Sequence, residues 1–280
     1  MAQAQVNGRT IEYDTRGSGA PLLFVMGLAG QLIDWPEEFI DLFVEEGFQT
    51  IRFDNRDAGL SDKDDWEPPS QRRLIRSFVT RRPLKGVGYT LQDMASDAAG
   101  LLDALDIGSA HVVGASMGGM IAQEMAISHP DKVSSVCSIM SNTGDRKNGG
   151  ISGRLVATIG RSVVPTRETA VEHAVKLFGL ISGPHYDPEL CRSQATWQVE
   201  RSFTPAGVAR QTAAIAASRD RTELLRSVTA PTLVIHGLTD PLVKPSGGVA
   251  TATAVPGSRL LNFPDMGHDL PRPRWHEIRN

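Results

Sequence analysis

The chain alternates between apolar, β-branched runs and amphipathic helical patterns, and this alternation restricts its fold more than any other feature. The β-like runs begin at Thr10, Pro21, Thr50, Ala110, Val133, Pro231 and Ser258. Several are apolar throughout, as expected of strands that helices cover on both faces of a parallel sheet. Helical patterns such as 36–47 and 91–106 lie between them, and Thr90 with Asp93 is typical of a capping pair. The order predicts an α/β fold with a mostly parallel, doubly wound sheet.

The alternation fails once, between about residues 142 and 203. Helical patterns fit at 151–164, 168–181, 188–203 and, just beyond, 205–218, without a convincing strand among them. Glycines and charges at the start of this segment (SNTGDRKNGGISG) indicate a flexible entry. We therefore expect one α/β core in two parts, 1–142 and 206–280, with a helical cap at 143–205 inserted between them.

The stretch VVGASMGG at 112–119 predicts a strand that turns into a helix with almost no loop. Such a turn forces its apex residue toward positive φ, and glycine on either side removes the Cβ atoms that would collide. The hydroxyl of Ser116 is then exposed where a helix begins. With 27 glycines in 280 residues a G-x-S-x-G match can arise by chance, so the argument depends on partners elsewhere in the chain.

A serine hydroxyl is a weak nucleophile at neutral pH, and it needs a base to take its proton and a carboxylate to orient that base. His268 falls in a loop beyond the last β-like run, and Asp240 follows the end of the run before it. Because open α/β sheets build their sites at the carboxyl edge, both side chains should emerge beside Ser116. The other histidines fit this role less well: His111, His129, His173, His185, His236 and His276.

The order Ser116, Asp240, His268 is that of the α/β-hydrolase triad. Together with GASMGG at 114–119, HGLTDPL at 236–242, MGHDLP at 266–271 and FDNRDAGLSD at 53–62, the chain resembles the α/β-hydrolase fold superfamily. More narrowly, its VMGLAG, RFDNRDAGLS and VVGASMGGMIAQ stretches are similar to actinobacterial serine esterases, including aclacinomycin methylesterase and mycobacterial carboxylesterase/lipases.

The resemblance implies an oxyanion hole made by the backbone N–H groups of Leu28 and Met117. The chain departs from the superfamily at Met26-Gly27, where relatives usually carry His-Gly. Backbone donors do not depend on that histidine side chain, so the hole can form without it. Serine in place of aspartate at the turn favours acyl transfer over the alkyl-enzyme chemistry of dehalogenases and epoxide hydrolases on this fold.

These residues predict a serine hydrolase that cleaves carboxylic esters through an acyl-enzyme, with no cofactor and no metal. The same triad also serves methylesterases, lipases, lactonases, thioesterases, C–C bond hydrolases and perhydrolases. A non-enzymatic ligand receptor on the same fold is an alternative from another class, and a lipid-surface binding protein is a third. Candidate substrate-binding residues are Gly27, Phe178, Trp197 and Phe203. Trp35 could also line an apolar pocket, and for the four aromatic residues core packing is an equal explanation.

The composition limits the classes of partner that the chain is expected to bind. A net charge of −3 and a pI near 6.2 give no general electrostatic reason to bind nucleic acid. The N-terminal stretch has no basic start followed by an apolar run, so we expect a cytoplasmic protein. From the predicted triad we expect its partner to be a small-molecule ester with an apolar acyl or alkyl part. The sequence leaves the oligomeric state open.

For two segments that contain several charged residues, a structural role is the preferred interpretation. The Arg-rich segment 70–85 could lie on a membrane surface, but a helix that packs Leu74, Ile75, Phe78 and Val79 on the core is favoured. In the stretch 53–62, an ion-paired and hydrogen-bonded loop is favoured over a catalytic role for Asp54, Arg56 and Ser61. Cys137, within an apolar run, is expected to be a buried thiol.

Overall fold

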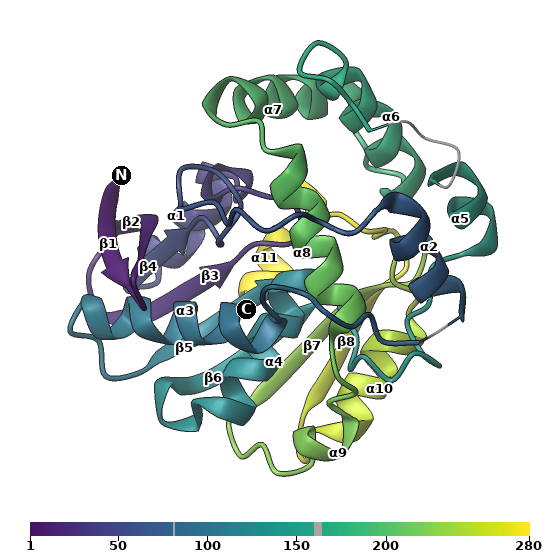
Figure 1. Ribbon diagram of the computed structural model, residues 1–280. Coiled ribbons are helices and arrows are strands. Elements are labelled where there is room, and N and C mark those ends of the chain that lie inside the picture. Colours follow the sequence, from purple (N-terminus) through teal and green to yellow (C-terminus); the bar gives the residue numbers. More distant parts are fainter. Residues whose placement is uncertain (81, 160–163) are drawn as a thin grey trace.

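A computed structural model of the chain describes residues 1–80, 82–159 and 164–280, and it is built on one eight-stranded sheet in the order β1-β2-β4-β3-β5-β6-β7-β8 (Figure 1). The strands from β4 to β8 across the sheet are parallel, and β1 and β2 are antiparallel additions at one edge. The strands are Ala2–Val6 (β1), Arg9–Arg16 (β2), Ala20–Val25 (β3), Phe48–Phe53 (β4), Ala110–Ala115 (β5), Val133–Ile139 (β6), Thr232–Gly237 (β7) and Arg259–Phe263 (β8). The expected α/β fold with a mostly parallel, doubly wound sheet is confirmed.

Helices cover both faces of this sheet, which explains why the central strands are apolar throughout. Along β3, Leu22 and Phe24 join one buried cluster, and Leu23 and Val25 join the other. The first cluster also takes side chains from α1 (Glu37–Glu45) and α11 (Trp275–Arg279). The second takes them from α3 (Leu91–Ala104), α4 (Met117–Ser128), α9 (Thr222–Leu225) and α10 (Ser246–Ala254). The expected capping pair of Thr90 and Asp93 is present at the start of α3.

The winding of the chain creates a switch point beside β3. From β3 the chain passes through α1 to β4 on one side, and then through α3 to β5 on the other side of β3. The chain leaves the carboxyl ends of β3 and β5 toward helices on opposite faces of the sheet, the arrangement at which open α/β sheets form a ligand-binding crevice. The loop after β3 carries Gly27 and Leu28, and Ser116 follows β5 directly.

Helices fill the segment between β6 and β7: α5 (Gly153–Ile159), α6 (Ala170–Ile181), α7 (Pro188–Arg201) and α8 (Pro205–Ala217). Each lies within one of the expected helical patterns, and residues 160–163 of the first pattern lie outside the described residues. Figure 1 shows α6 and α7 above the sheet, with α8 leading back down to it. Asp187 caps the start of α7, and its carboxylate accepts hydrogen bonds from the N–H groups of Glu189 and Leu190.

The Arg-rich segment forms α2 (Gln71–Thr80), but the prediction that its apolar residues pack on the core was wrong for two of them. Leu74 is buried against α8, whereas Phe78 and Val79 are 36% and 63% exposed. The buried residues of α2 are Leu74 and Ser77, so the side of the helix that packs on α8 runs through these two residues and leaves Phe78 and Val79 outside it. Arg81 lies outside the described residues.

Two further differences concern the strands. The strand β1 was not predicted, because its sequence AQAQV has no apolar run and it lies at the edge of the sheet, where most of its residues are exposed. Cys137 on β6 is only partly buried as a residue, because it borders a cavity, but its thiol is buried as expected and this burial raises the pKa of the thiol to about 12. Within the described residues, no helix is both long and apolar enough to cross a membrane.

Candidate functional site

Ser116 lies at the apex of the turn between β5 and α4, in a backbone conformation that few non-glycine residues adopt, with φ 56° and ψ −115°. The residues two positions before and after it have to be glycine. A Cβ atom on Gly114 would collide with the carbonyl of Gly118, and one on Gly118 would collide with the carbonyl of Val25 in β3. The close packing of β3, β5 and α4 therefore fixes the turn and holds the Ser116 hydroxyl at the carboxyl edge of the sheet.

The structure brings together three side chains that the sequence analysis placed at this edge. The Nε2 atom of His268 lies 2.9 Å from the Oγ atom of Ser116, and its Nδ1 atom lies 2.7 Å from Oδ2 of Asp240. A carboxylate only accepts, so Nδ1 carries the hydrogen and Nε2 is free to accept from the serine hydroxyl. This arrangement, called the triad below, joins loops after β5, β7 and β8.

The carboxylate of Asp240 is fully buried, and both of its oxygens accept hydrogen bonds. Its Oδ1 accepts hydrogen bonds from the backbone N–H groups of Leu242 and Val243, at 2.8 and 2.9 Å. Its Oδ2 faces His268. Because the amides hold Oδ1, the carboxylate has one orientation and presents Oδ2 to the imidazole.

A second histidine, His236 at the end of β7, lies behind this carboxylate. Its Nε2 donates to the carbonyl of Val243 at 2.8 Å and is 3.7 Å from Oδ2 of Asp240. Burial lowers the pKa of His236, so its ring is neutral near pH 7 and adds no positive charge beside Asp240. The sequence analysis placed His236 near the end of a strand but gave no sign of this contact.

The expected oxyanion donors lie on either side of Ser116, with Leu28 on the loop after β3 and Met117 at the first position of α4. Among the described residues, no group accepts a hydrogen bond from the N–H of Leu28 or of Met117. A Cβ atom on Gly27 would lie 3.8 Å from Oγ of Ser116, so the loop after β3 passes directly beside the hydroxyl. This loop is fixed by Asn55, which donates to the carbonyl of Met26 at 2.9 Å. The missing histidine at position 26 leaves the position of the loop beside Ser116 intact.

The loop at 53–62 has the structural role that its sequence favoured. Arg56 forms a buried ion pair with Asp97 of α3 at 2.6 Å, and the Ser61 hydroxyl donates to the carbonyl of Asp54 at 2.6 Å. Asp54 is fully buried and accepts from Arg201 of α7 at 2.7 Å. The loop thereby joins the core to the inserted helices.

Polar contacts also fix α7 above the loop after β3. Gln194 and Gln198 donate to the two carboxylate oxygens of Asp34 at 2.8 and 2.9 Å. Burial raises the pKa of Asp34 to about 6. Gln31 adds hydrogen bonds to carbonyls at the end of α7, so the inserted helix is anchored beside the crevice through hydrogen bonds.

The residues proposed to bind substrate are distributed over the inserted helices. Phe178 of α6 and Trp197 of α7 are 42% and 43% exposed, and Phe203, between α7 and α8, is partly buried. Among the described residues, neither a hydrogen bond nor a ring contact joins these three to the triad. Two leucines are exposed on loops beside the triad: Leu28, next to Gly27 on the loop that passes Ser116, and Leu238, two residues before Asp240. Leu238 was not singled out in the sequence.

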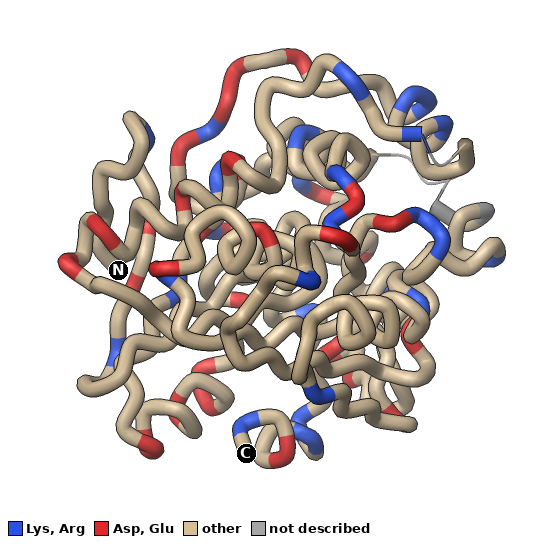
Figure 2. The backbone as a smooth tube through the Cα atoms, turned by 90° about the horizontal axis from the view of Figure 1, so that it is seen from below, with Lys and Arg blue, Asp and Glu red and all other residues tan. Residues whose placement is uncertain are grey.

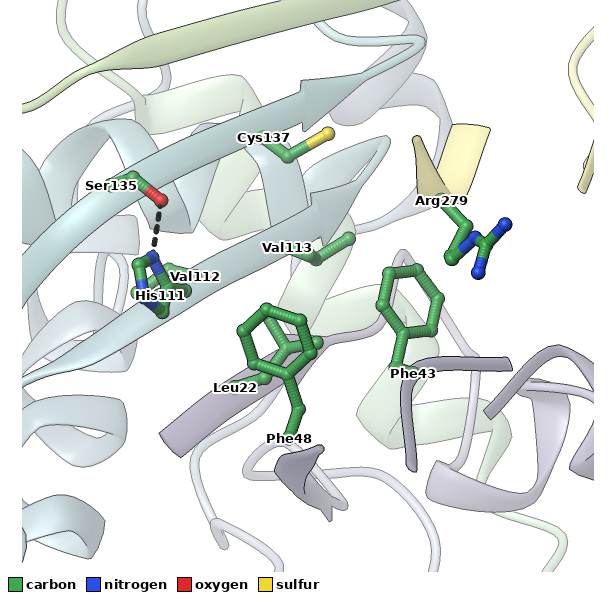
Figure 3. A pocket seen from close by; sticks show the side chains of 9 residues that line it. All are labelled: Leu22, Phe43, Phe48, His111, Val112, Val113, Ser135, Cys137 and Arg279. Carbon is green, nitrogen blue, oxygen red and sulfur yellow. Dashed lines mark hydrogen bonds between the residues drawn. The ribbon is translucent and has the colours of Figure 1, made fainter. Parts of the chain in front are cut away.

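A cavity of about 150 Å³ lies elsewhere, on the face of the sheet that carries α1 and α11 (Figure 3). Its walls include Leu22, Phe43 and Val113, and His111 donates to or accepts from the Ser135 hydroxyl at 2.7 Å. None of the triad residues lines it, so it is separate from the site built around Ser116.

Within the described residues, neither clustered charge nor metal-binding groups indicate a second functional site. Figure 2 shows acidic and basic residues dispersed over the chain, in keeping with the small net charge. In the part of the chain that the structure describes, no group of three or more His, Cys, Asp or Glu residues is arranged to hold a metal ion.

Comparison with known sequences gives matches over most of the chain. A family profile described as "alpha/beta hydrolase fold" matches residues 20–152. The chain is 29% identical over 263 residues to BpoC of Mycobacterium tuberculosis, assigned by name to the non-heme bromoperoxidases, with 92% of this chain and 90% of that protein covered. It is 26% identical over 274 residues to the rhodomycin D methylesterase DnrP of Streptomyces peucetius, with 90% and 86% covered.

Solved structures agree with these matches. An enol-lactonase from Burkholderia xenovorans superposes with a TM-score of 0.76 at 22% identity, over 99% of this chain and 96% of that one. The BpoC crystal structure superposes with a TM-score of 0.67 at 26% identity, over 94% and 91%. Proteins with differently named activities thus share this fold, so the choice among those activities depends on the geometry of the site.

Proposed function

The chain has the α/β-hydrolase fold, and from this premise we propose that it hydrolyses carboxylic esters through an acyl-enzyme on Ser116. One observation carries the proposal: the Ser116 hydroxyl lies 2.9 Å from an imidazole nitrogen whose partner nitrogen is held by a buried carboxylate. This is the geometry that makes a serine nucleophilic at neutral pH.

In the first step, Oγ of Ser116 attacks the ester carbonyl while Nε2 of His268 takes the hydroxyl proton. Asp240 holds the ring and stabilises the imidazolium that forms. The carbonyl oxygen becomes an oxyanion and accepts hydrogen bonds from the N–H groups of Leu28 and Met117. The tetrahedral species then collapses, the C–O bond to the alcohol breaks, and His268 returns the proton to the departing alcohol.

In the second step, water replaces the alcohol. His268 takes a proton from the water as its oxygen attacks the acyl carbon, and the same amides stabilise the second oxyanion. When the bond to Ser116 breaks, His268 gives its proton back to Oγ. The products are one alcohol and one carboxylic acid, and the enzyme is restored without any cofactor.

The surroundings of Ser116 favour a substrate with an apolar part. Leu28 is exposed on the loop that passes beside Ser116, Leu238 is exposed two residues before Asp240, and Phe178 and Trp197 present exposed rings on the inserted helices. We assign to residues 143–205 the role of a cap that shapes this apolar space above the crevice. A lactone is a cyclic ester and opens by the same first step, so the similarity to an enol-lactonase makes lactones the second substrate class to try.

The test is the initial rate of hydrolysis of p-nitrophenyl esters of increasing acyl length by the wild type and by Ser116→Ala. Ser128→Ala is the matched control, because Ser128 is an exposed serine at the far end of the same helix α4. We expect Ser116→Ala to lose at least about 10³-fold in kcat and to keep its melting temperature, and Ser128→Ala to match the wild type. A Ser116→Ala protein that works at full rate would refute the proposal.

A further inference from the structure

The loop that carries His268 rests on the turn between α6 and α7. The backbone N–H of His268 donates to the carbonyl of Ile181, the last residue of α6, at 2.7 Å. These residues are 87 positions apart in the sequence and belong to different parts of the fold. The main chain of His268 is therefore held by the inserted helices, although its imidazole acts in the core.

Asp269, the next residue, bridges the same two segments. Its Oδ1 accepts the N–H of Gly267 at 2.9 Å, and its Oδ2 accepts the N–H of Gly183 at 3.1 Å. One carboxylate thus binds the residue before His268 in its own loop and the first residues of the α6–α7 turn. We call this set of contacts around Asp269 the carboxylate clamp.

The two backbones are in direct contact at the carboxylate clamp. A Cβ atom on Gly267 would lie 2.5 Å from the backbone nitrogen of Gly183 and from the carbonyl oxygen of Ile181. No larger residue fits there, so the loop and the turn cannot shift independently while the clamp is formed.

A second contact joins the outer ends of the same segments. Nε2 of His185, in the turn, lies 2.7 Å from Oδ2 of Asp265, in the loop. Arg274 also binds both oxygens of Asp265, each at 3.0 Å. Arg274 and His185 lower the pKa of Asp265 to about 2, so this residue is a carboxylate at neutral pH. The loop is therefore attached to the turn on both sides of His268.

We propose that Asp269 is a positioning residue: its carboxylate clamps the α6–α7 turn to the His268 loop and so keeps the imidazole in reach of Ser116. Docking of the inserted helices and reactivity of Ser116 are then coupled, because displacing the turn removes the support of the base. This proposal rests on the proposed function, since it concerns the base of that reaction. Small displacements matter, because a shift of about 1 Å in a catalytic group can lower a rate about 100-fold.

The test compares Asp269→Ala and Asp269→Asn with Asp187→Ala. Asp187 is the matched control: it too accepts two backbone N–H groups beside the same turn, at 2.9 and 3.1 Å, but it does not touch the His268 loop. Three quantities are measured for each protein: kcat and KM for p-nitrophenyl acetate, the rate constant of Ser116 labelling by a fluorophosphonate, and the melting temperature.

We expect Asp269→Ala to lower both kcat and the labelling rate about 10-fold or more, with KM within about two-fold of the wild type. The kcat and labelling rate of Asp269→Asn should lie between those of Asp269→Ala and the wild type, because its amide oxygen can still accept a hydrogen bond from one of the two N–H groups. Asp187→Ala should keep kcat within about two-fold of the wild type, even if its melting temperature falls as much as that of Asp269→Ala.

Several results would overturn the clamp. These are an Asp269→Ala protein with unchanged kcat, an equal loss of kcat in Asp187→Ala, or a change confined to KM, which would make the turn a substrate-binding element. Should Asp269→Ala not fold, Asp269→Asn decides, and unchanged kcat and labelling would contradict the clamp. A wild type that neither hydrolyses esters nor reacts with the phosphonate would instead remove the proposed function itself.

Discussion

Replacing Asp240 with asparagine should abolish most activity while changing the shape of the site very little. The two backbone N–H groups that bind Oδ1 at 2.8 and 2.9 Å decide how the new amide is oriented. The amide oxygen has to stay on those donors, so the NH₂ group faces Nδ1 of His268. Because the NH₂ group is a donor, Nδ1 has to accept its hydrogen bond, and the hydrogen of the imidazole ring then moves to Nε2. In that tautomer His268 can no longer accept the proton of Ser116.

The magnitude follows from these hydrogen bonds. Turning the amide over would leave two buried N–H groups unsatisfied, at about 1–3 kcal/mol each. Even the lower sum, about 2 kcal/mol, leaves only about one molecule in 30 with the working tautomer. Loss of the negative charge that stabilises the imidazolium acts in addition. We expect kcat/KM to fall by about 10³–10⁴, equivalent to about 4–5.5 kcal/mol of transition-state stabilisation.

The assay is the initial rate with p-nitrophenyl acetate, run beside a thermal melt of each protein. Asp131→Asn, at an exposed position, is the control and should keep the wild-type rate. A loss below about 10-fold in a folded Asp240→Asn protein would refute the reasoning, because it would mean that another group orients His268.

Three more predictions concern stability. Gly118→Ala should prevent folding or lower the melting temperature steeply, because the new methyl group would collide with a β3 carbonyl, whereas Gly108→Ala, in open space, should melt like the wild type. Arg201→Met should cost about 3–5 kcal/mol in chemical unfolding, because it leaves the buried carboxylate of Asp54 without its ion pair. The folded-state pKa of Asp34, about 6, is above its ordinary value of 3.8, so the folded state favours the protonated carboxyl. The contribution of this protonation to the free energy of unfolding is full below pH 3.8 and is lost as the pH rises to 6. Urea unfolding from pH 4 to pH 7 should therefore show Asp34→Asn gaining at most about 3 kcal/mol relative to the wild type, and a pH-independent difference would contradict this.

The sequence was informative wherever local pattern and chain order decide the structure. The central strands are apolar because helices cover both faces of the sheet, and Gly114 and Gly118 predict the turn because only glycine permits the close approach of β3 and α4. Ser116, Asp240 and His268 each follow a strand end, so their meeting at one edge follows from the parallel sheet.

Other features depend on contacts between distant residues, and no local pattern reports them. Asp269 bonds to Gly183 across 86 positions, and nothing around either residue indicates the other. His236 approaches Asp240 because the chain turns back after β7. The exposure of Val79 depends on which face of α2 meets α8, and the helical pattern fits either arrangement. The strand β1 forms through pairing with β2, which overrides its polar sequence.

The central claim is that Ser116 is the nucleophile, and intact-protein mass spectrometry after treatment with a fluorophosphonate tests it most directly. The account predicts one phosphonyl group per chain on the peptide that contains Ser116, loss of ester hydrolysis in proportion to labelling, and an unlabelled Ser116→Ala protein. Labelling at another residue, or ester hydrolysis that survives complete labelling of Ser116, would contradict it.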